Sequence, residues 1–259
     1  MNSIAIIPAR MGSSRFPGKP LAPIHGLPMI GHVYERTRRC QQLAATYVAT
    51  CDREIYEFIE SIGGQAVMTA DTHERCTDRT AEALLAVEKA TRRKTDIVVM
   101  VQGDEPMVTP GMIDESLKPF QADPAVKVVN LMAPLADVTE FEDPNEVKVV
   151  TDLKNDALYF SREPIPSRRK GVAEVPMQKQ VCIIPFRRDY LLRFNALPET
   201  PLERIESVDM MRILENGEKV RMVPTHTQTL SVDTPQELER VVELMQADDL
   251  MPDYMDESF

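Results

Sequence analysis

Short apolar runs alternate with segments of helical period through the first half of the chain. Strands are expected at residues 4–7, 47–50, 65–68 and 96–101, and helices at 29–40, 53–62 and 79–92. Alternation of this kind is typical of a parallel sheet with helices on both faces. Sheets of this class bind ligands beyond the carboxyl ends of their strands, so functional residues are expected just after Ile7, Thr50 and Val101.

The pattern changes to strand-like pieces between about residues 126 and 186. These pieces, at 126–133, 146–152, 157–160 and 181–186, predict an antiparallel or mixed extension of the sheet that serves as a lid and dimer-contact region. Helical period returns at 202–214 and at 235–245, where Thr234 is a candidate N-cap, and the acidic tail from 248 to 259 is expected to fray. We therefore predict one α/β domain over residues 1–259 with a strand-rich region at about 126–186.

Composition argues against several classes of partner. The chain carries 41 acidic and 30 basic residues, a net charge of −11, and this balance repels nucleic acid. No apolar segment approaches the ~18 to 20 residues that a membrane span needs, so we expect no membrane association and a cytoplasmic protein. The four cysteines lie far apart with no C-x-x-C pair, which argues against zinc and favours buried apolar thiols.

A loop rich in small and basic residues follows the first strand. It reads Arg10-Met11-Gly12-Ser13-Ser14-Arg15-Phe16-Pro17-Gly18-Lys19. The glycines, Ser13 and Ser14 let backbone N–H groups approach phosphate oxygens. Arg10 and Arg15 can grip those oxygens with forked donors, and Lys19 adds a compact charge. The loop has neither G-x-G-x-x-G nor P-loop spacing, so the alternative is a basic surface loop. We predict a triphosphate site here.

Two acidic positions are candidates for a metal site. Asp104 lies in the motif Gln102-Gly103-Asp104-Glu105-Pro106 at the end of the most apolar strand, and Asp233 lies between an apolar strand and a helix. Mg²⁺ takes hard oxygen ligands of this kind together with substrate phosphates. A nucleoside triphosphate brings about four negative charges that the basic loop offsets only in part, so a shared metal ion is expected. The alternatives are an acidic turn at Asp104 and a helix cap at Asp233.

These motifs resemble the 3-deoxy-manno-octulosonate cytidylyltransferase (CMP-Kdo synthetase) family, in order, along nearly the whole chain. The matching segments are P-A-R-x-G-S-S-R-F-P-G-K-P-L from Pro8, Val48-Ala49-Thr50-x-Asp52, Thr77-Asp78-Arg79, Val101-Gln102-Gly103-Asp104-Glu105-Pro106, Asp143-Pro144-Asn145, Ala157-Leu158-Tyr159-Phe160-Ser161-Arg162, Pro201-Leu202-Glu203-Arg204-Ile205-Glu206 and Val232-Asp233-Thr234-Pro235. The resemblance implies a homodimer with a nucleotide-diphospho-sugar transferase-like (Rossmann-like) fold. That fold is a three-layer α/β/α mixed sheet with a strand-rich subdomain.

The resemblance also implies the activity. The enzyme would transfer CMP from CTP to an acidic sugar, Kdo or a related 2-keto-3-deoxy acid, and release pyrophosphate with Mg²⁺ as cofactor. The anomeric 2-hydroxyl of the sugar would attack the α-phosphorus directly. Lys19, Asp104 and Asp233 would be catalytic, with the two aspartates as metal ligands. Arg10, Ser13, Ser14, Arg15, Lys19, Arg79 and Gln102 would bind the nucleotide, and Arg162, Glu203 and Glu206 the acceptor.

Departures from the family's pattern cluster on or near the acceptor side. Gln180-Val181-Cys182 stands where a His-x-Gly element is usual, so Gln180 is expected beside the acceptor in place of an imidazole. Ser167-Arg168-Arg169-Lys170 adds positive charge, while Cys76 and Cys51 replace a glycine and an aspartate. Two alternatives therefore stay open: a different acid acceptor, such as an amino-substituted Kdo or a phosphonate-type acid, and a nucleotide-binding regulatory protein with little turnover.

Overall fold

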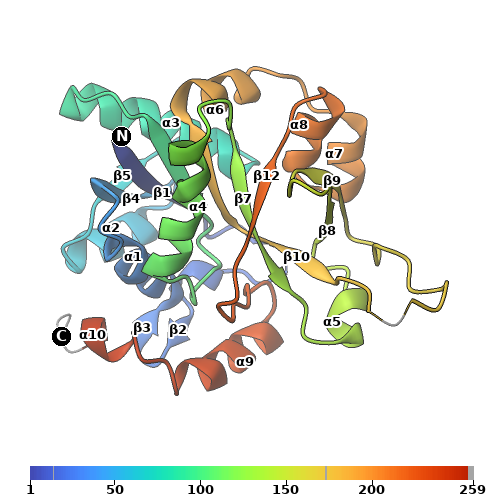
Figure 1. The fold of residues 1–259 in the computed structure, drawn as a ribbon. Helices are drawn as coiled ribbons and strands as arrows, with labels where there is room; N and C mark the ends of the chain where they lie inside the picture. Colours follow the sequence, from blue (N-terminus) through green and yellow to red (C-terminus); the bar gives the residue numbers. More distant parts are fainter. Residues whose placement is uncertain (14, 173, 256–259) are drawn as a thin grey trace. The chain divides into compact units, whose positions relative to one another are not determined.

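The computed structural model describes residues 1–13, 15–172 and 174–255, which group into two compact units (Figure 1). Unit 1 combines Met1–Asp114 with the returning segment Thr229–Phe259, and unit 2 is Glu115–Gln228. Helix α4 (Pro110–Ala122) runs across the boundary between them in the sequence. The interpretation of the chain as one domain with a lid region stays a prediction.

Unit 1 is built on a parallel sheet whose strands lie in the order β6-β1-β4-β5. Every residue of β1 and of β6 is buried, as their apolar runs predict. The elements are β1 (Ser3–Ala9), a 3-10 turn (Lys19–Leu21), β2 (Pro23–Ile24), β3 (Leu27–Pro28), α1 (Met29–Arg38), β4 (Ala45–Thr50), α2 (Arg53–Ser61), β5 (Ala66–Met68), α3 (Cys76–Thr91), β6 (Ile97–Val101), α9 (Pro235–Met245) and α10 (Pro252–Met255).

The connections of unit 1 place helices on both faces of this sheet. Crossovers between parallel strands are right-handed, so α1 and α2, which lead from β1 through β4 to β5, cover one face. Helix α3 leads back across the sheet from β5 to β6 and covers the other face. The three layers expected from the sequence are thus present. The chain adds β4 and β5 on one side of β1 and then adds β6 on the other side. This reversal of strand order creates a crevice at the carboxyl ends of β1 and β6.

Unit 2 contains a second sheet in the order β12-β7-β10-β8-β9. Strands β12 and β7 are parallel, and the other neighbours are antiparallel. One short turn, residues 152–156, joins β8 to β9, as expected for antiparallel neighbours. The elements are β7 (Val129–Pro134), α5 (Val138–Glu142), β8 (Lys148–Thr151), β9 (Ala157–Ser161), β10 (Gln178–Val181), β11 (Ile183–Arg187), α6 (Arg188–Asn195), α7 (Pro201–Glu206), α8 (Met210–Glu215) and β12 (Arg221–Pro224).

Three expectations need correction. The helix predicted over 202–214 is two helices, because Ser207 adopts a left-handed backbone conformation (φ 53°) between α7 and α8. The strand predicted over 181–186 is interrupted at Cys182, between β10 and β11. The acidic tail is not frayed as far as residue 255: α10 forms there, and its Tyr254 is fully buried. Helix α4 escaped prediction because it contains Pro119 and begins at Pro110.

Candidate active site

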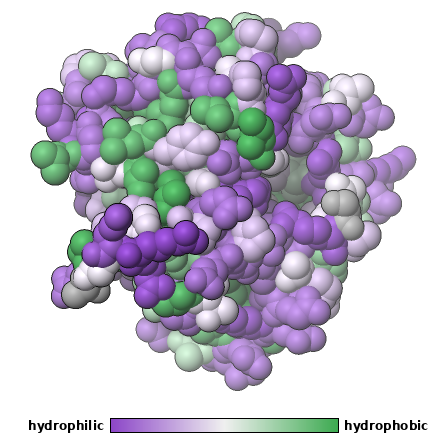
Figure 2. Space-filling model, turned by 90° about the vertical axis from the view of Figure 1, so that its right-hand side faces the viewer, coloured by the Kyte–Doolittle hydropathy of each residue, from purple (hydrophilic) through white to green (hydrophobic). Residues whose placement is uncertain are grey.

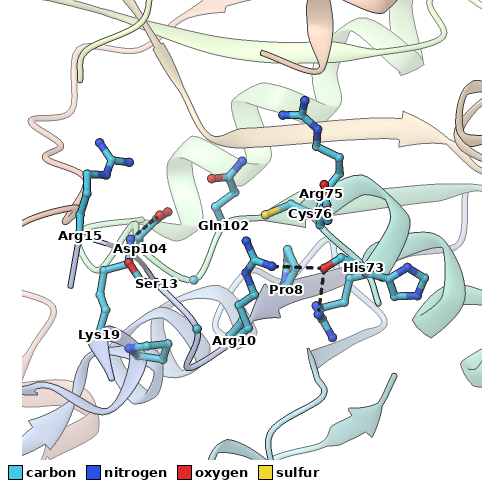
Figure 3. A pocket seen from close by; sticks show the side chains of 16 residues that line it. Pro8, Arg10, Ser13, Arg15, Lys19, His73, Arg75, Cys76, Gln102 and Asp104 are labelled. Carbon is cyan, nitrogen blue, oxygen red and sulfur yellow. Dashed lines mark hydrogen bonds and ion pairs between the residues drawn. The ribbon is translucent and has the colours of Figure 1, made fainter. Parts of the chain in front are cut away.

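A cavity of about 250 Å³ opens at the carboxyl ends of β1 and β6, where the strand order reverses (Figure 3). Ligands of open α/β sheets bind at such a switch point. All the lining residues belong to unit 1: Pro8, Ala9, Arg10, Gly12, Ser13, Arg15, Lys19, Pro20, His73, Glu74, Arg75, Cys76, Arg79, Gln102, Gly103 and Asp104. The cavity therefore brings together every predicted nucleotide ligand in the described residues.

The basic loop after β1 folds back on itself. The Met11 carbonyl accepts hydrogen bonds from the backbone N–H groups of Ser13 (2.9 Å) and Gly18 (3.2 Å). Gly18 has a φ of +76°, which only glycine adopts without strain. Met11 N donates to Asp52 Oδ2 at 2.7 Å, so a residue beyond β4 holds the loop in place. Ser14, predicted as a nucleotide ligand, lies outside the described residues.

The Lys19 ammonium lies between two carboxylates. Its Nζ donates to Asp104 Oδ2 at 2.9 Å and to Asp233 Oδ1 at 3.0 Å. Burial of the lysine by itself lowers its pKa, but the two carboxylates outweigh burial and raise the pKa to about 12. Lys19 is therefore charged at physiological pH. The three residues predicted to be catalytic meet at one point of unit 1.

The two aspartates also fit a divalent cation. Asp104 Oδ1 is buried and has no hydrogen-bond partner, whereas Asp233 Oδ2 pairs with Arg15 at 2.9 Å. A buried carboxylate oxygen without a partner is costly, and a hard cation would satisfy it. Within the described ranges no cluster of three or more His, Cys, Asp or Glu side chains forms a metal site. Substrate phosphates and water would therefore complete the coordination, as Mg²⁺ prefers.

Two hydrogen bonds bring the Asp233 segment to the end of β6. Val232 N donates to the Asp104 carbonyl at 2.9 Å, and Thr229 Oγ1 donates to Glu105 Oε2 at 3.0 Å. Glu105 is only 3% exposed, so its bond to Thr229 is made in the protein interior. Bonds to buried carboxylates are costly to break, because they lie away from water. They account for the proximity of Asp104 and Asp233.

Two predicted nucleotide ligands, Arg79 and Arg10, share a partner in the rim of the cavity. Arg79 is 3% exposed and donates to Thr69 Oγ1 and to the carbonyls of Ala70 and His73. Arg10 Nη1 also donates to the His73 carbonyl, at 3.4 Å. Arg79 thus stabilises the segment around residues 69–73 by hydrogen bonds in the interior. Arg10 is exposed and is the more accessible of the two guanidinium groups.

The end of the cavity away from Lys19 contains residues that the sequence did not single out as ligands. His73, Glu74 and Arg75 line it together with Cys76, the first residue of α3. Figure 3 shows the Cys76 sulfur pointing toward Gln102. Their position directly before the motif Thr77-Asp78-Arg79 was the only available signal in the sequence.

The predicted acceptor ligands lie in unit 2, and two of them are tied to each other. Arg162 Nε donates to the Glu206 carbonyl at 2.8 Å, and Arg162 N donates to Glu206 Oε2 at 2.9 Å. Tyr159 and Ser161 hydroxyls donate to Glu206 Oε1 at 3.1 and 3.2 Å. Both predicted residues therefore contribute to holding β9 against α7.

The other two predicted acceptor ligands differ in burial. Gln180 is half-buried on β10 and donates to Asn130 Oδ1 at 2.6 Å. Glu203 is fully buried and forms a bidentate ion pair with Arg212. Arg212 Nε donates to Glu203 Oε2 at 2.7 Å and Arg212 Nη2 donates to Glu203 Oε1 at 2.5 Å. A carboxylate with no exposed surface and two charged bonds has a structural role in unit 2, so this geometry does not favour acceptor binding by Glu203.

A family model described as Cytidylyltransferase matches residues 4–220. The chain belongs to the cytidylyltransferase family. This cytidylyltransferase is 45% identical over 253 residues to the 3-deoxy-manno-octulosonate cytidylyltransferase of Geobacter metallireducens. The matched region covers 94% of this chain and 97% of the relative. The resemblance found in the sequence is thereby confirmed, and the protein is a nucleotidyltransferase.

Solved structures agree with this assignment. The structure of CMP:2-keto-3-deoxy-manno-octonic acid synthetase complexed with CTP superposes with a TM-score of 0.85 at 40% identity and covers 95% of this chain and 99% of that chain. A cytidylyltransferase from Leptospira borgpetersenii shares the fold at 17% identity, with a TM-score of 0.63, covering 95% and 87%. The predicted fold class is confirmed. No helix in the described part of this cytidylyltransferase is long and apolar enough to cross a membrane.

Proposed function

We propose that this cytidylyltransferase transfers CMP from CTP to 3-deoxy-manno-octulosonate or a closely related 2-keto-3-deoxy acid. The observation that carries the proposal is the convergence of Lys19, Asp104 and Asp233 at the edge of a cavity lined by the basic loop. The relatives' names support these substrates, and the cavity at the switch point of the sheet supports a nucleotide site there.

The residues of unit 1 suit a triphosphate. Arg15 and Lys19 place two positive charges at one end of the cavity, where they would offset the phosphate charge. Gln102 lies between this end and Cys76, and its amide can both donate and accept, as recognition of a pyrimidine edge requires. This arrangement would align the α-phosphorus for attack by the anomeric hydroxyl, while the bond to pyrophosphate breaks.

Asp104 and Asp233 would hold Mg²⁺. When bound, the ion supplies charge neutralisation at the phosphates and lowers the pKa of an acceptor hydroxyl. The chain's own part is to hold both carboxylates beside Lys19 and to present the unpartnered Asp104 Oδ1. Magnesium dependence is therefore part of the proposal.

The acceptor is proposed to contact unit 2 through Arg162, Gln180 and Glu206. Gln180 offers an amide, and the exposed run Arg168-Arg169-Lys170 adds positive charge to the same unit. An acid with more negative charge than Kdo, such as a phosphonate-type acid, is the second candidate acceptor, because such a run attracts anions.

The test is pyrophosphate release from CTP and Mg²⁺ with a panel of acids that includes Kdo, amino-substituted Kdo and phosphonates. Turnover with Kdo supports the first candidate. Turnover with another acid and none with Kdo supports the second, and CTP binding with no release in any mixture indicates a nucleotide-binding protein. Asp104→Asn and Asp233→Asn should each reduce release by at least about 100-fold, whereas the exposed control Asp249→Asn should not.

We also propose a cytoplasmic homodimer formed through unit 2. Large apolar side chains exposed there include Leu153 (106%), Leu158 (61%) and Ile205 (74%). The face shown in Figure 2, which carries β8, β9 and α7, has apolar side chains among polar ones. These exposed apolar groups offer surface that a second copy of the chain would bury. Light scattering of the wild type and of Leu158→Glu should show a dimer and a weakened dimer, respectively.

A further inference from the structure

The backbone of Asp233 is held by a carboxylate from the helix that follows it. Glu237 Oε2 accepts hydrogen bonds from Asp233 N at 2.6 Å and from Thr234 N at 2.8 Å. A capping box needs only the bond to Thr234 N, with the reciprocal bond from Glu237 N to Thr234 Oγ1, here 3.3 Å. The bond to Asp233 N is additional, and it fixes the residue whose side chain faces Lys19.

The helix that carries Glu237 is itself firmly anchored. Val241 and Met245 of α9 are fully buried in a core cluster with Ile24, Met29, Met107, Leu230 and Val232. The His25 ring also bonds to the Val242 carbonyl, with 2.8 Å between Nε2 and the oxygen. Glu237 is therefore presented to Asp233 from a rigid support, which is the condition for positioning a functional group.

The side chain of Asp233 is divided between two cations. Oδ1 accepts from Lys19 at 3.0 Å and Oδ2 pairs with Arg15 at 2.9 Å. Lys19 also contacts Asp104 and so keeps the two carboxylates together, whereas the half-exposed Arg15 can draw the Asp233 side chain away from Asp104 unless the backbone is held. The Glu237 bond to Asp233 N and the Val232 N bond to the Asp104 carbonyl hold it on both sides.

We propose that Glu237 is a positioning residue of the active site: it holds the Asp233 backbone so that the carboxylate stays beside Lys19 and Asp104. The inference rests on the proposed function, because Asp233 matters there as a ligand of the divalent cation and of the nucleotide site. Glu237 acts through Asp233 and not by contact with a substrate.

The test compares two substitutions of equal length, Glu237→Met, which removes the acceptor, and Glu237→Gln, which keeps one. Two readouts are needed: exchange of the Asp233 backbone amide by NMR without metal or nucleotide, and Mn²⁺ binding in the presence of CTP without acceptor. Glu237→Met should speed the amide exchange and weaken Mn²⁺ binding by about tenfold or more, and Glu237→Gln should stay within about threefold of wild type.

Two controls separate positioning from helix stability. Thr234→Ala removes the cap hydroxyl and should lower the melting temperature, but it leaves the Glu237 bond to Asp233 N and should keep Mn²⁺ binding. Glu239→Ala removes an exposed carboxylate from the same helix and should change neither readout. If Glu237→Met does not fold, Glu237→Ala takes its place.

The proposal is overturned if loss of the Glu237 acceptor changes Mn²⁺ binding no more than Thr234→Ala does, or if Glu237→Gln behaves like Glu237→Met. Its failure is distinguishable from failure of the proposed function. A wild type that binds CTP and Mn²⁺ without transferring CMP contradicts the function, whereas the amide exchange and the Mn²⁺ binding still decide the role of Glu237.

Discussion

The Lys19 ammonium donates to Asp104 Oδ2 at 2.9 Å, while the other oxygen of the same carboxylate is buried without a partner. One carboxylate thus has one oxygen neutralised by the protein and one available to a cation. The same ammonium contacts Asp233, so it offsets the repulsion between two acidic groups before any ligand binds. If CTP and a divalent cation bind here as proposed, their binding free energies depend on the charge of Lys19.

Replacement of Lys19 by methionine should have opposite effects on metal binding and on activity. Removal of the ammonium leaves two facing carboxylates with one cation fewer, so Mn²⁺ should bind the CTP-free protein more tightly than it binds wild type. CMP transfer should fall by about 100-fold or more because a charge beside the triphosphate is lost. Calorimetry and pyrophosphate release measure the two effects, with the exposed Lys89→Met as control. Weaker Mn²⁺ binding by the variant would contradict this account.

Deprotonation of Lys19 should not lower the rate of CMP transfer in the neutral pH range. Its pKa is raised to about 12, so the stability it contributes is fully present below its ordinary value near 10.5 and is lost as the pH rises through about 12. Rates of pyrophosphate release between pH 6 and 10 test this. A fall in the wild-type rate near pH 8 that is absent from Lys19→Arg would be the opposing result.

The buried His32 should make the protein less stable in acid. Burial lowers its pKa to about 4, and Nδ1 accepts from the Tyr254 hydroxyl at 2.7 Å while Nε2 donates to the Ile24 carbonyl at 2.8 Å. In the unfolded chain the His32 ring binds a proton near pH 6.5, whereas in the folded chain it binds one only near pH 4. Stability from this group is therefore present above pH 6.5 and lost as the pH falls toward 4, by up to about 3 kcal/mol.

Urea denaturation at pH 7 and pH 4.5 measures this loss. His32→Asn removes the titrating ring, so the free energy of unfolding of the variant should fall less between the two pH values than that of wild type. An equal fall in both proteins would show that other groups cause the acid sensitivity.

Alkylation of Cys76 should block nucleotide binding. The thiol lines the cavity and its sulfur points toward Gln102, whereas Cys40 is buried and its pKa is raised to about 12 by burial and by Asp114. Iodoacetamide should inactivate the enzyme, CTP should protect it, and Cys76→Ser should resist the reagent. Cys182→Ser serves as the matched control and should remain sensitive. Inactivation of Cys76→Ser at the wild-type rate would place the sensitive thiol elsewhere.

Loss of Glu203 should affect stability and not acceptor recognition. Glu203→Ala removes the carboxylate that neutralises the buried Arg212 guanidinium and should cost about 3 to 5 kcal/mol of unfolding free energy. Arg212→Ala should cost a similar amount, and the double variant should cost less than the sum. The KM for the acid should stay at the wild-type value at a temperature where the variants are folded. A raised KM with unchanged stability would restore the acceptor role.

Local patterns in the sequence predicted a large part of the fold. The strands and helices of residues 1–101 lie close to their expected positions. The spacing of apolar residues shows which face of a segment is buried, and that spacing is a local property of the sequence. The N-cap at Thr234 was also predictable, because a cap depends on four consecutive residues. The break at Ser207 was not, because no glycine or proline marks it and packing of α7 against α8 decides the conformation of that residue.

The sequence by itself determined the residue types of the site: a basic loop after one strand and an aspartate after another, each a local feature. Only the tertiary structure decided that Lys19 lies between Asp104 and Asp233, that Arg79 and Glu203 are buried in structural bonds, and that Glu237 holds Asp233. The physical reason is that contacts between segments far apart in the chain depend on how whole elements pack, and periodicity carries no record of that packing.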